Sequence, residues 1–387
     1  MNPVTMFFEL LRSEGCGGEL TEELKQSLTP ERLEEIYSIA KDHDLAHIAG
    51  QALGKNRLLP KGEISEQFRK QTMLALMRCS WLENAYENIC QTLTCANIPF
   101  IPLKGAILRK YYPESWMRTS CDIDILVREE MVEAAAKVLE EKQNYTRGLK
   151  TLHDISLHSP GGVHLELHYT TVEENRAVNA AAVLDRIWED ARPEAEGSFC
   201  YVLSDAMFYF YHIAHMAKHV QEGGCGVRTF LDLWILNHKV SFDSESRQAL
   251  LTEGGLLTFA KTAESLAEAW FSGTEADALT CQLARFVLHG GMYGSMENDV
   301  AVKQMHRGGK LGYALSRIFP PYKKMKFRYP VLKKHPWLLP VYHVVRWCSV
   351  LKKGNTGQSV QEMWINATLP EQAQQTLARM MRELELQ

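Results

Sequence analysis

Residues 121–127, Cys-Asp-Ile-Asp-Ile-Leu-Val, limit the possible folds of this chain more than any other segment. Polar and apolar residues alternate there with a period of two, which is the signature of a β-strand. Residues 64–96 instead carry apolar side chains at helical spacing and contain neither Gly nor Pro, which predicts one long helix whose apolar stripe packs in the core. A chain with both patterns, 45% apolar and 23% charged, is a folded α/β or α+β protein and not a disordered one.

Three regions follow from these patterns along the 387 residues. Residues 1–97 are predicted to be helical, residues 98–200 to mix strands with helices, and residues 201–387 to be helical again. Within the middle region we expect strands near 98–103, 121–127, 153–158 and 163–170. The predicted organisation is thus a sheet-containing core between two helical regions.

Charge is distributed unevenly along the chain. The net charge is -4, yet residues 301–353 hold thirteen of the 43 Lys and Arg residues and none of the 47 Asp and Glu residues. Such a basic segment suggests a local anionic partner. Interleaved aromatic residues also permit nucleic-acid contact, although a solvated face is the commoner meaning of such a run.

Cysteine usage and apolar runs indicate the cellular compartment. None of the nine cysteines forms a Cys-x-x-Cys pair, and an odd count does not suit a disulfide framework. The first residues lack the basic start of a signal peptide, and no run approaches the roughly 20 apolar residues of a membrane span. We therefore expect a cytoplasmic protein without a membrane-spanning segment.

Asp122 and Asp124 are the strongest candidates for chemistry. Alternate residues of a strand share a face, and here the intervening and following residues are apolar, which draws the strand into a core. Two partly buried carboxylates need a partner. Mg²⁺, or Mn²⁺, is a suitable one, with water and substrate phosphates completing its ligands. The alternative is an ordinary solvated strand face.

A second polar face lies in the segment 163–169, Val-His-Leu-Glu-Leu-His-Tyr. His164, Glu166 and His168 share one side of the predicted strand. Glu166 would add a third carboxylate to a divalent-metal site formed with Asp122 and Asp124. The two histidines with Glu166 could alternatively bind zinc, or the segment could be a half-buried amphipathic strand.

Residues 103–106, Leu-Lys-Gly-Ala, end one predicted strand and begin a helix. Backbone N–H groups at a helix start suit a phosphate, and Lys104 adds a positive charge beside Gly105 and Ala106. Arg118, four residues before the Asp pair, could neutralise further phosphate charge or lie on the surface.

The order of these segments resembles the DNA-polymerase-β-like nucleotidyltransferase superfamily. The resemblance is closer to an uncharacterised bacterial nucleotidyltransferase family, through Leu-Lys-Gly at 103–105, Arg-x-x-x-Asp-Ile-Asp-Ile-Leu-Val at 118–127 and Leu-Glu-Leu-His at 165–168. Segments around 215–219, 228–232 and 319–321 are also similar to that family, so the resemblance covers roughly residues 30–350. It implies an α+β fold with a polymerase-β-like core, built on a short mixed sheet with helical regions on both sides.

The resemblance also implies an activity. A nucleotidyl group would pass from a nucleoside triphosphate (NTP) to an unidentified hydroxyl-bearing acceptor, with release of pyrophosphate. Asp122, Asp124 and Glu166 would be the catalytic metal ligands, and Lys104, Gly105, Ala106 and Arg118 would bind the nucleotide. The wider superfamily has Gly-Ser before its Asp pair, whereas Ala106 follows Gly105 here.

Two other functions use the same residues. A glycosyltransferase of the Asp-x-Asp type would hold a nucleotide sugar through the metal at Asp122 and Asp124. A catalytically degenerate nucleotidyltransferase fold would act as a binding or regulatory protein, and Ala106 favours it because the hydroxyl contact is lost.

Polar residues on the apolar helices after Ser204 are candidates for the acceptor side. His215, Arg228 and Asp232 are expected nearest the chemistry, with the basic segment 301–353 extending the same wall toward an anionic acceptor. His215 and His219 lie one helical turn apart, and Arg228 could pair with Asp232, four residues on. Structural roles for these residues are the alternative.

Overall fold

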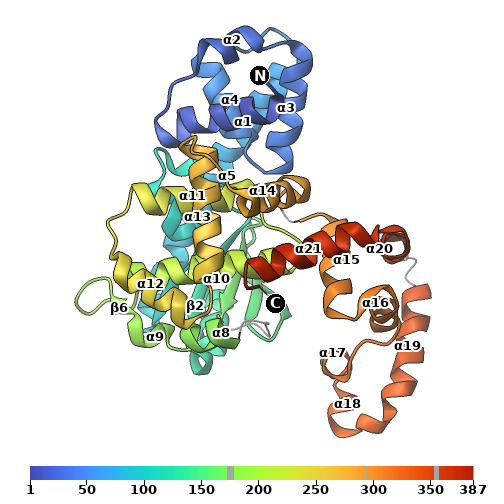
Figure 1. Cartoon of the computed structure of the whole chain (residues 1–387). Coiled ribbons are helices and arrows are strands. Elements are labelled where there is room, and N and C mark those ends of the chain that lie inside the picture. The colour runs from blue at the N-terminus through green and yellow to red at the C-terminus, as the bar shows by residue number, and fades with distance from the viewer. Residues whose placement is uncertain (172–177, 293, 353–356, 387) are drawn as a thin grey trace.

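A five-stranded sheet lies at the centre of the chain, surrounded by helices (Figure 1). The computed structural model describes residues 1–171, 178–292, 294–352 and 357–386. The strand order is β1-β2-β5-β4-β3, in which β2 and β5 are parallel and the other pairs are antiparallel. The strands are β1 (Phe100–Pro102), β2 (Asp122–Val127), β3 (Thr146–Lys150), β4 (Asp154–His158) and β5 (His164–His168). The prediction of an α+β fold with a short mixed sheet is confirmed.

One face of the sheet is apolar and is covered by two helices, α5 (Glu63–Cys95) and α7 (Val132–Gln143). Ile123, Ile125 and Leu165 point to this side and are at most 3% exposed. The alternation seen in the sequence therefore leaves the polar residues of β2 and β5 on the opposite face.

The opposite face of the sheet is turned toward α10 (Asp205–Gln221) and α11 (Val227–His238). These helices share one large hydrophobic core with the N-terminal helices and with the C-terminal end of the chain. The helices around them are α1 (Pro3–Leu11), α2 (Glu22–Ser27), α3 (Pro30–Asp42), α4 (Ala46–Lys55), α12 (Ser244–Glu253), α13 (Leu257–Phe271), α14 (Ala278–Gly290) and α21 (Glu371–Glu383).

Short elements fill the connections within and after the sheet. They are α6 (Gly105–Leu108), α8 (Val178–Leu184), α9 (Ile187–Asp190) and a two-stranded ribbon of β6 (Arg192–Pro193) and β7 (Tyr201–Val202). The 3₁₀ turns Arg109–Tyr111 and Ser115–Met117 connect α6 with β2.

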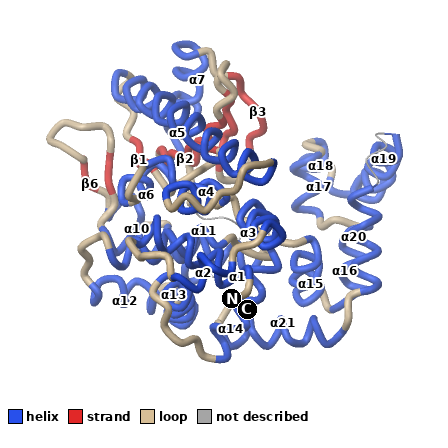
Figure 2. The backbone as a smooth tube through the Cα atoms, turned by 90° about the horizontal axis from the view of Figure 1, so that it is seen from above, coloured by secondary structure: helices blue, strands red, loops and turns tan. Residues whose placement is uncertain are grey.

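The remaining C-terminal helices form a lobe that projects away from the sheet in both views (Figures 1 and 2). They are α15 (Met296–His306), α16 (Gly309–Ile318), α17 (Tyr322–Arg328), α18 (Val331–Lys334), α19 (Leu339–Lys352) and α20 (Gly357–Thr368). The nine cysteines are all free. Among the described residues, no helix combines the length and apolarity that crossing a membrane requires.

Two details of the sequence prediction are wrong. Part of the apolar stripe in the middle of α5 is not core: Met73 and Trp81 are more than half exposed, whereas Ala75 and Cys79 are buried. Strand β3 was not predicted: its residues are all exposed and carry no apolar alternation. Pairing with β4 and ion pairs from Arg147 to Glu133 and Glu140 of α7 hold this edge strand in place.

Candidate active site

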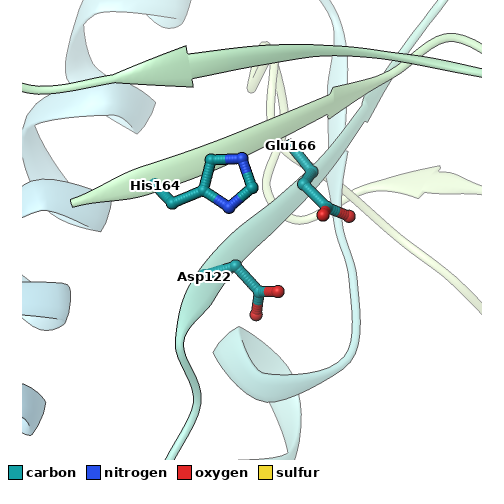
Figure 3. Close-up of side chains that lie close together, drawn as sticks. All are labelled: Asp122, His164 and Glu166. Carbon is teal, nitrogen blue, oxygen red and sulfur yellow. The ribbon is translucent and has the colours of Figure 1, made fainter. Parts of the chain in front are cut away.

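The pairing of β2 with β5 brings the predicted carboxylates together. The two strands are parallel, with Asp122 opposite His164 and Asp124 opposite Glu166. Residues opposite one another on parallel strands point to the same face and lie about 4.8 Å apart. The side chains of Asp122, His164 and Glu166 accordingly project to one side of the two strands (Figure 3).

Two overlapping groups of side chains in the described chain could hold a metal ion. One contains Asp122, His164 and Glu166, and the other contains Asp124, Glu166 and His168. Within each group, one ligand atom per residue lies within 4.8 Å of the others. Glu166 belongs to both groups and therefore lies at the centre of the site.

Asp124 is almost fully buried and is held by two cationic groups at the same oxygen. Lys104 Nζ and His168 Nε2 contact Asp124 Oδ1 at 2.8 and 2.9 Å. Burial by itself would raise the pKa of Asp124, but the Lys104 charge and the His168 hydrogen bond outweigh it and lower the pKa. Burial likewise opposes protonation of His168, yet its contacts with Asp124 and Glu166 raise its pKa to about 9.

Asp122 and Glu166 differ in how their charge is compensated. Burial, and then the like charge of Asp124, raise the pKa of Asp122. A hydrogen bond from His168 lowers the pKa of Glu166 despite burial. Of the three carboxylates, Asp122 is therefore the one whose ionised form the protein stabilises least. An external cation would stabilise that form.

The turn after β1 has an unusual backbone. Lys104 has φ 43° and ψ -115°, a conformation that normally suits glycine. Gly105 follows it, and a Cβ there would lie 3.3 Å from Ser120 Oγ. The predicted helix after Gly105 is only four residues long before it becomes a 3₁₀ turn. So short a helix has a weak dipole, and the lysine amine is the main positive group that this turn provides.

The carboxylates open into a cavity of about 320 Å³ between the sheet and helices α10 and α11. Its lining contains most of the residues singled out in the sequence: Lys104, Gly105, Arg118, Asp122, Asp124, Glu166, His168, His215, His219, Arg228 and Asp232. Among the described residues, Ala106 and the basic segment 301–353 contribute nothing to this lining. The basic segment instead lies in the separate lobe, so it does not extend this wall as expected.

Arg118 and Asp232 form a buried ion pair in the cavity wall. Arg118 Nε lies 2.8 and 3.1 Å from the two carboxylate oxygens of Asp232, which is 0% exposed, and Tyr112 donates its hydroxyl to the same carboxylate at 2.7 Å. Both carboxylate oxygens of Asp232 therefore accept hydrogen bonds within the protein, and the positive charge of Arg118 is compensated by Asp232.

Arg228 does not pair with Asp232 as its spacing suggested. Its guanidinium contacts Asp44 at 3.0 Å and Thr119 at 3.1 Å, because Asp44 in the turn between α3 and α4 approaches α11 and Asp232 is occupied by Arg118. The Nε atom of Arg228 is buried and has no hydrogen-bond partner within the described chain. Arg228 therefore has one unpaired donor within the cavity wall.

His215 and His219 contact each other through their Nε2 atoms at 3.1 Å on the cavity side of α10. Burial, and then the nearby Lys104, hold the pKa of His215 well below its ordinary value. His215 is therefore neutral at pH 7 and can donate or accept a hydrogen bond, but it adds no charge.

Of the histidines and lysines in the lining, three were not singled out from the sequence: His153, His212 and Lys218. Lys218 lies one turn after His215, and this helical spacing is the signal that could have identified it. No comparable signal marks His153, which lies in the turn before β4 and reaches the site only through strand pairing.

Comparison with known sequences agrees with this geometry. The sequence model of an uncharacterised nucleotidyltransferase family matches residues 29–272, which include the whole sheet, α10 and α11. The matched part ends before the C-terminal lobe, earlier than the 30–350 expected from the motifs. No curated protein and no solved structure gives a significant match. The chain belongs to this uncharacterised nucleotidyltransferase family.

Proposed function

We propose that the cavity catalyses nucleotidyl transfer from an NTP to a hydroxyl-bearing acceptor. The acceptor oxygen attacks the α-phosphorus, the bond from that phosphorus to the bridging oxygen breaks, and pyrophosphate leaves. The proton of the acceptor hydroxyl passes to Glu166, whose lowered pKa keeps it ionised, and then to water. The observation that carries the proposal is the in-register placement of three carboxylates on two parallel strands, within a family of nucleotidyltransferases.

The donor atoms fit Mg²⁺ or Mn²⁺. Asp122, Asp124 and Glu166 offer carboxylate oxygens, which these hard cations prefer. His168 Nε2 is already engaged by Asp124 and Glu166, so a zinc site built on both histidines is the poorer fit. When bound, the ions would neutralise charge on the triphosphate and on the leaving pyrophosphate.

The protein's own cations supply the remaining positive charge. We infer that Lys104, fixed by Asp124 with its side chain 22% exposed, contacts the triphosphate at the turn. Gly105 lets this turn pack closely against the segment before β2, since a Cβ at this position would lie 3.3 Å from Ser120 Oγ, and so keeps Lys104 beside the carboxylates. Arg228 would use its unpaired Nε toward the acceptor or the departing phosphates. Arg118, which is neutralised by Asp232, acts through positioning.

One observation favours a second candidate, a catalytically degenerate binding protein. Lys104 and His168 neutralise Asp124 without any metal, so a retained carboxylate could have a purely structural role. The glycosyltransferase alternative rests on the same Asp pair and gains no separate support.

The test is an Asp122→Asn variant with Asp185→Asn as matched control, because Asp185 is an exposed carboxylate outside the cavity. Removing a buried charge, and with it the repulsion from Asp124, should stabilise the metal-free Asp122→Asn protein by about 1 kcal/mol. At the same time, the rise in melting temperature caused by Mg²⁺ with an NTP should vanish. Pyrophosphate release, followed with each NTP and candidate hydroxyl acceptors, should vanish as well.

The outcomes separate the candidates. A metal-dependent shift and pyrophosphate release in the parent and in Asp185→Asn support nucleotidyl transfer. If the melting temperature of the parent rises with Mg²⁺ and an NTP but no combination of NTP and acceptor releases pyrophosphate, the protein is a binding protein and not a transferase. If Asp122→Asn keeps the full metal-dependent shift, the ligand assignment is wrong.

A further inference from the structure

The C-terminal lobe combines exposed apolar side chains with positive charge. We call residues 301–352 the basic lobe. Large apolar side chains of this lobe are exposed to an unusual degree, with Trp337 at 74% and Leu311 at 73%. The others are Leu315, Phe319, Phe327, Val331, Val341, Val344 and Val345. Exposed apolar groups gathered in one part of a molecule mark an interaction surface.

The exposed apolar residues follow the helical repeat, so each helix presents a face. On α16 they recur at every fourth residue, from Leu311 through Leu315 to Phe319. On α19, Val341, Val344 and Val345 share one side. The C-terminal end of α16 contacts α19: the ring of Phe319 packs against His343 at 5.5 Å, and Trp347 Nε1 donates to the carbonyl oxygen of Ile318 at 3.2 Å. The two helices thus bring exposed apolar residues into the same lobe.

The same lobe also exposes positive charge. Arg328, Lys333 and Lys334 are exposed beside the apolar residues, and the segment 301–353 contains no Asp or Glu. Apolar side chains flanked by Lys and Arg are the composition of helices that lie in the interface of an anionic membrane. The described helices are too short or too polar to cross a bilayer, which agrees with a surface position.

We propose that the basic lobe docks the protein on the surface of a membrane that contains anionic lipids. Trp337 and the aliphatic side chains enter the boundary between headgroups and acyl chains, while Lys333 and Lys334 face the lipid phosphates. A nucleic acid would use the charge but leave Leu and Val side chains without a partner. A symmetric dimer through this lobe would place like charges opposite one another. The proposal does not depend on the reaction in the cavity.

The test is flotation of the full-length protein with lipid vesicles. Vesicles of phosphatidylcholine with about 30% phosphatidylglycerol are compared with pure phosphatidylcholine. We expect binding to the anionic vesicles only, weakened by salt because exposed charges are screened. Replacement of Lys333 and Lys334 by Ala should weaken binding about thirtyfold, and Trp337→Ala at least about tenfold.

Matched controls use exposed residues of the same types outside the lobe. Lys61→Ala with Lys70→Ala controls for charge, and Trp81→Ala, 57% exposed on α5, controls for apolar area. These variants should bind like the parent, and melting temperatures should show that every variant folds. The proposal is overturned by an absence of vesicle binding, by equal losses in the controls, or by lobe-dependent dimers or duplex-DNA binding without vesicle binding.

Discussion

Replacing Asp232 by Ala tests whether this residue is structural or belongs to the acceptor site. The change leaves the Arg118 guanidinium, which is 7% exposed, without its counter-charge and removes the acceptor of the Tyr112 hydroxyl. Breaking one side of a buried ion pair costs about 3–5 kcal/mol, because the remaining charge stays desolvated. We therefore expect Asp232→Ala to lower the free energy of unfolding by about 4 kcal/mol.

Urea unfolding followed by circular dichroism measures this loss. Two comparisons make the measurement specific. Replacing both partners, Arg118→Met with Asp232→Leu, should recover most of the stability, since no buried charge is then left unpaired. Glu383→Ala breaks the exposed pair with Arg379 and should cost less than about 1 kcal/mol.

The reasoning is refuted if Asp232→Ala costs less than about 1 kcal/mol, or if the double variant is no more stable than the single one. A variant that remains fully stable, binds an NTP normally and has lost pyrophosphate release would instead assign Asp232 to the acceptor site.

Two further predictions concern a buried histidine and a strained turn. Burial lowers the pKa of His43 to about 4, so the folded protein keeps it neutral while the unfolded chain binds a proton below about pH 6.5. Stability should therefore fall as the pH drops from about 6.5 to 4, and His43→Gln should remove roughly 2–3 kcal/mol of the loss between pH 7 and pH 4.5; an unchanged pH slope would contradict this. The φ of Lys104 is positive, a conformation that glycine adopts without strain. The Lys104→Gly variant should therefore be about 1–2 kcal/mol more stable than Lys104→Ala, although both lack the amine. Equal urea midpoints of the two variants would show that the turn is unstrained.

Alternation in the sequence was sufficient to predict which side chains share a face. In β2 and β5 every second residue is apolar, and the faces follow from that period alone. The sequence could not show that β5 would lie beside β2 in a register that places Glu166 opposite Asp124. That neighbour relation depends on the sheet order, which local patterns do not encode.

Partners of the charged residues were the least predictable part. Helical spacing suggested a pair between Arg228 and Asp232, but each residue found a partner more than 100 positions away, in Asp44 and Arg118. Local spacing describes exposed pairs on one helix, whereas buried charges take whichever counter-charge the tertiary fold brings near. The same limit applies to the middle of α5, whose apolar stripe remained partly exposed because no element covers Met73 and Trp81 in the described structure.

The distribution of charge within the carboxylate group argues for separate roles of its members. Two cationic groups hold the Oδ1 atom of Asp124, so this residue is fixed and neutralised before any ligand arrives. Asp122 has no such support, and burial beside Asp124 disfavours its ionised form. A cation would therefore be best placed between Asp122 and Glu166, on the side of the sheet that opens into the cavity. A cation there would relieve the repulsion among the three carboxylates and offer its remaining coordination positions to an anionic substrate, so the same electrostatic imbalance would favour both metal and triphosphate.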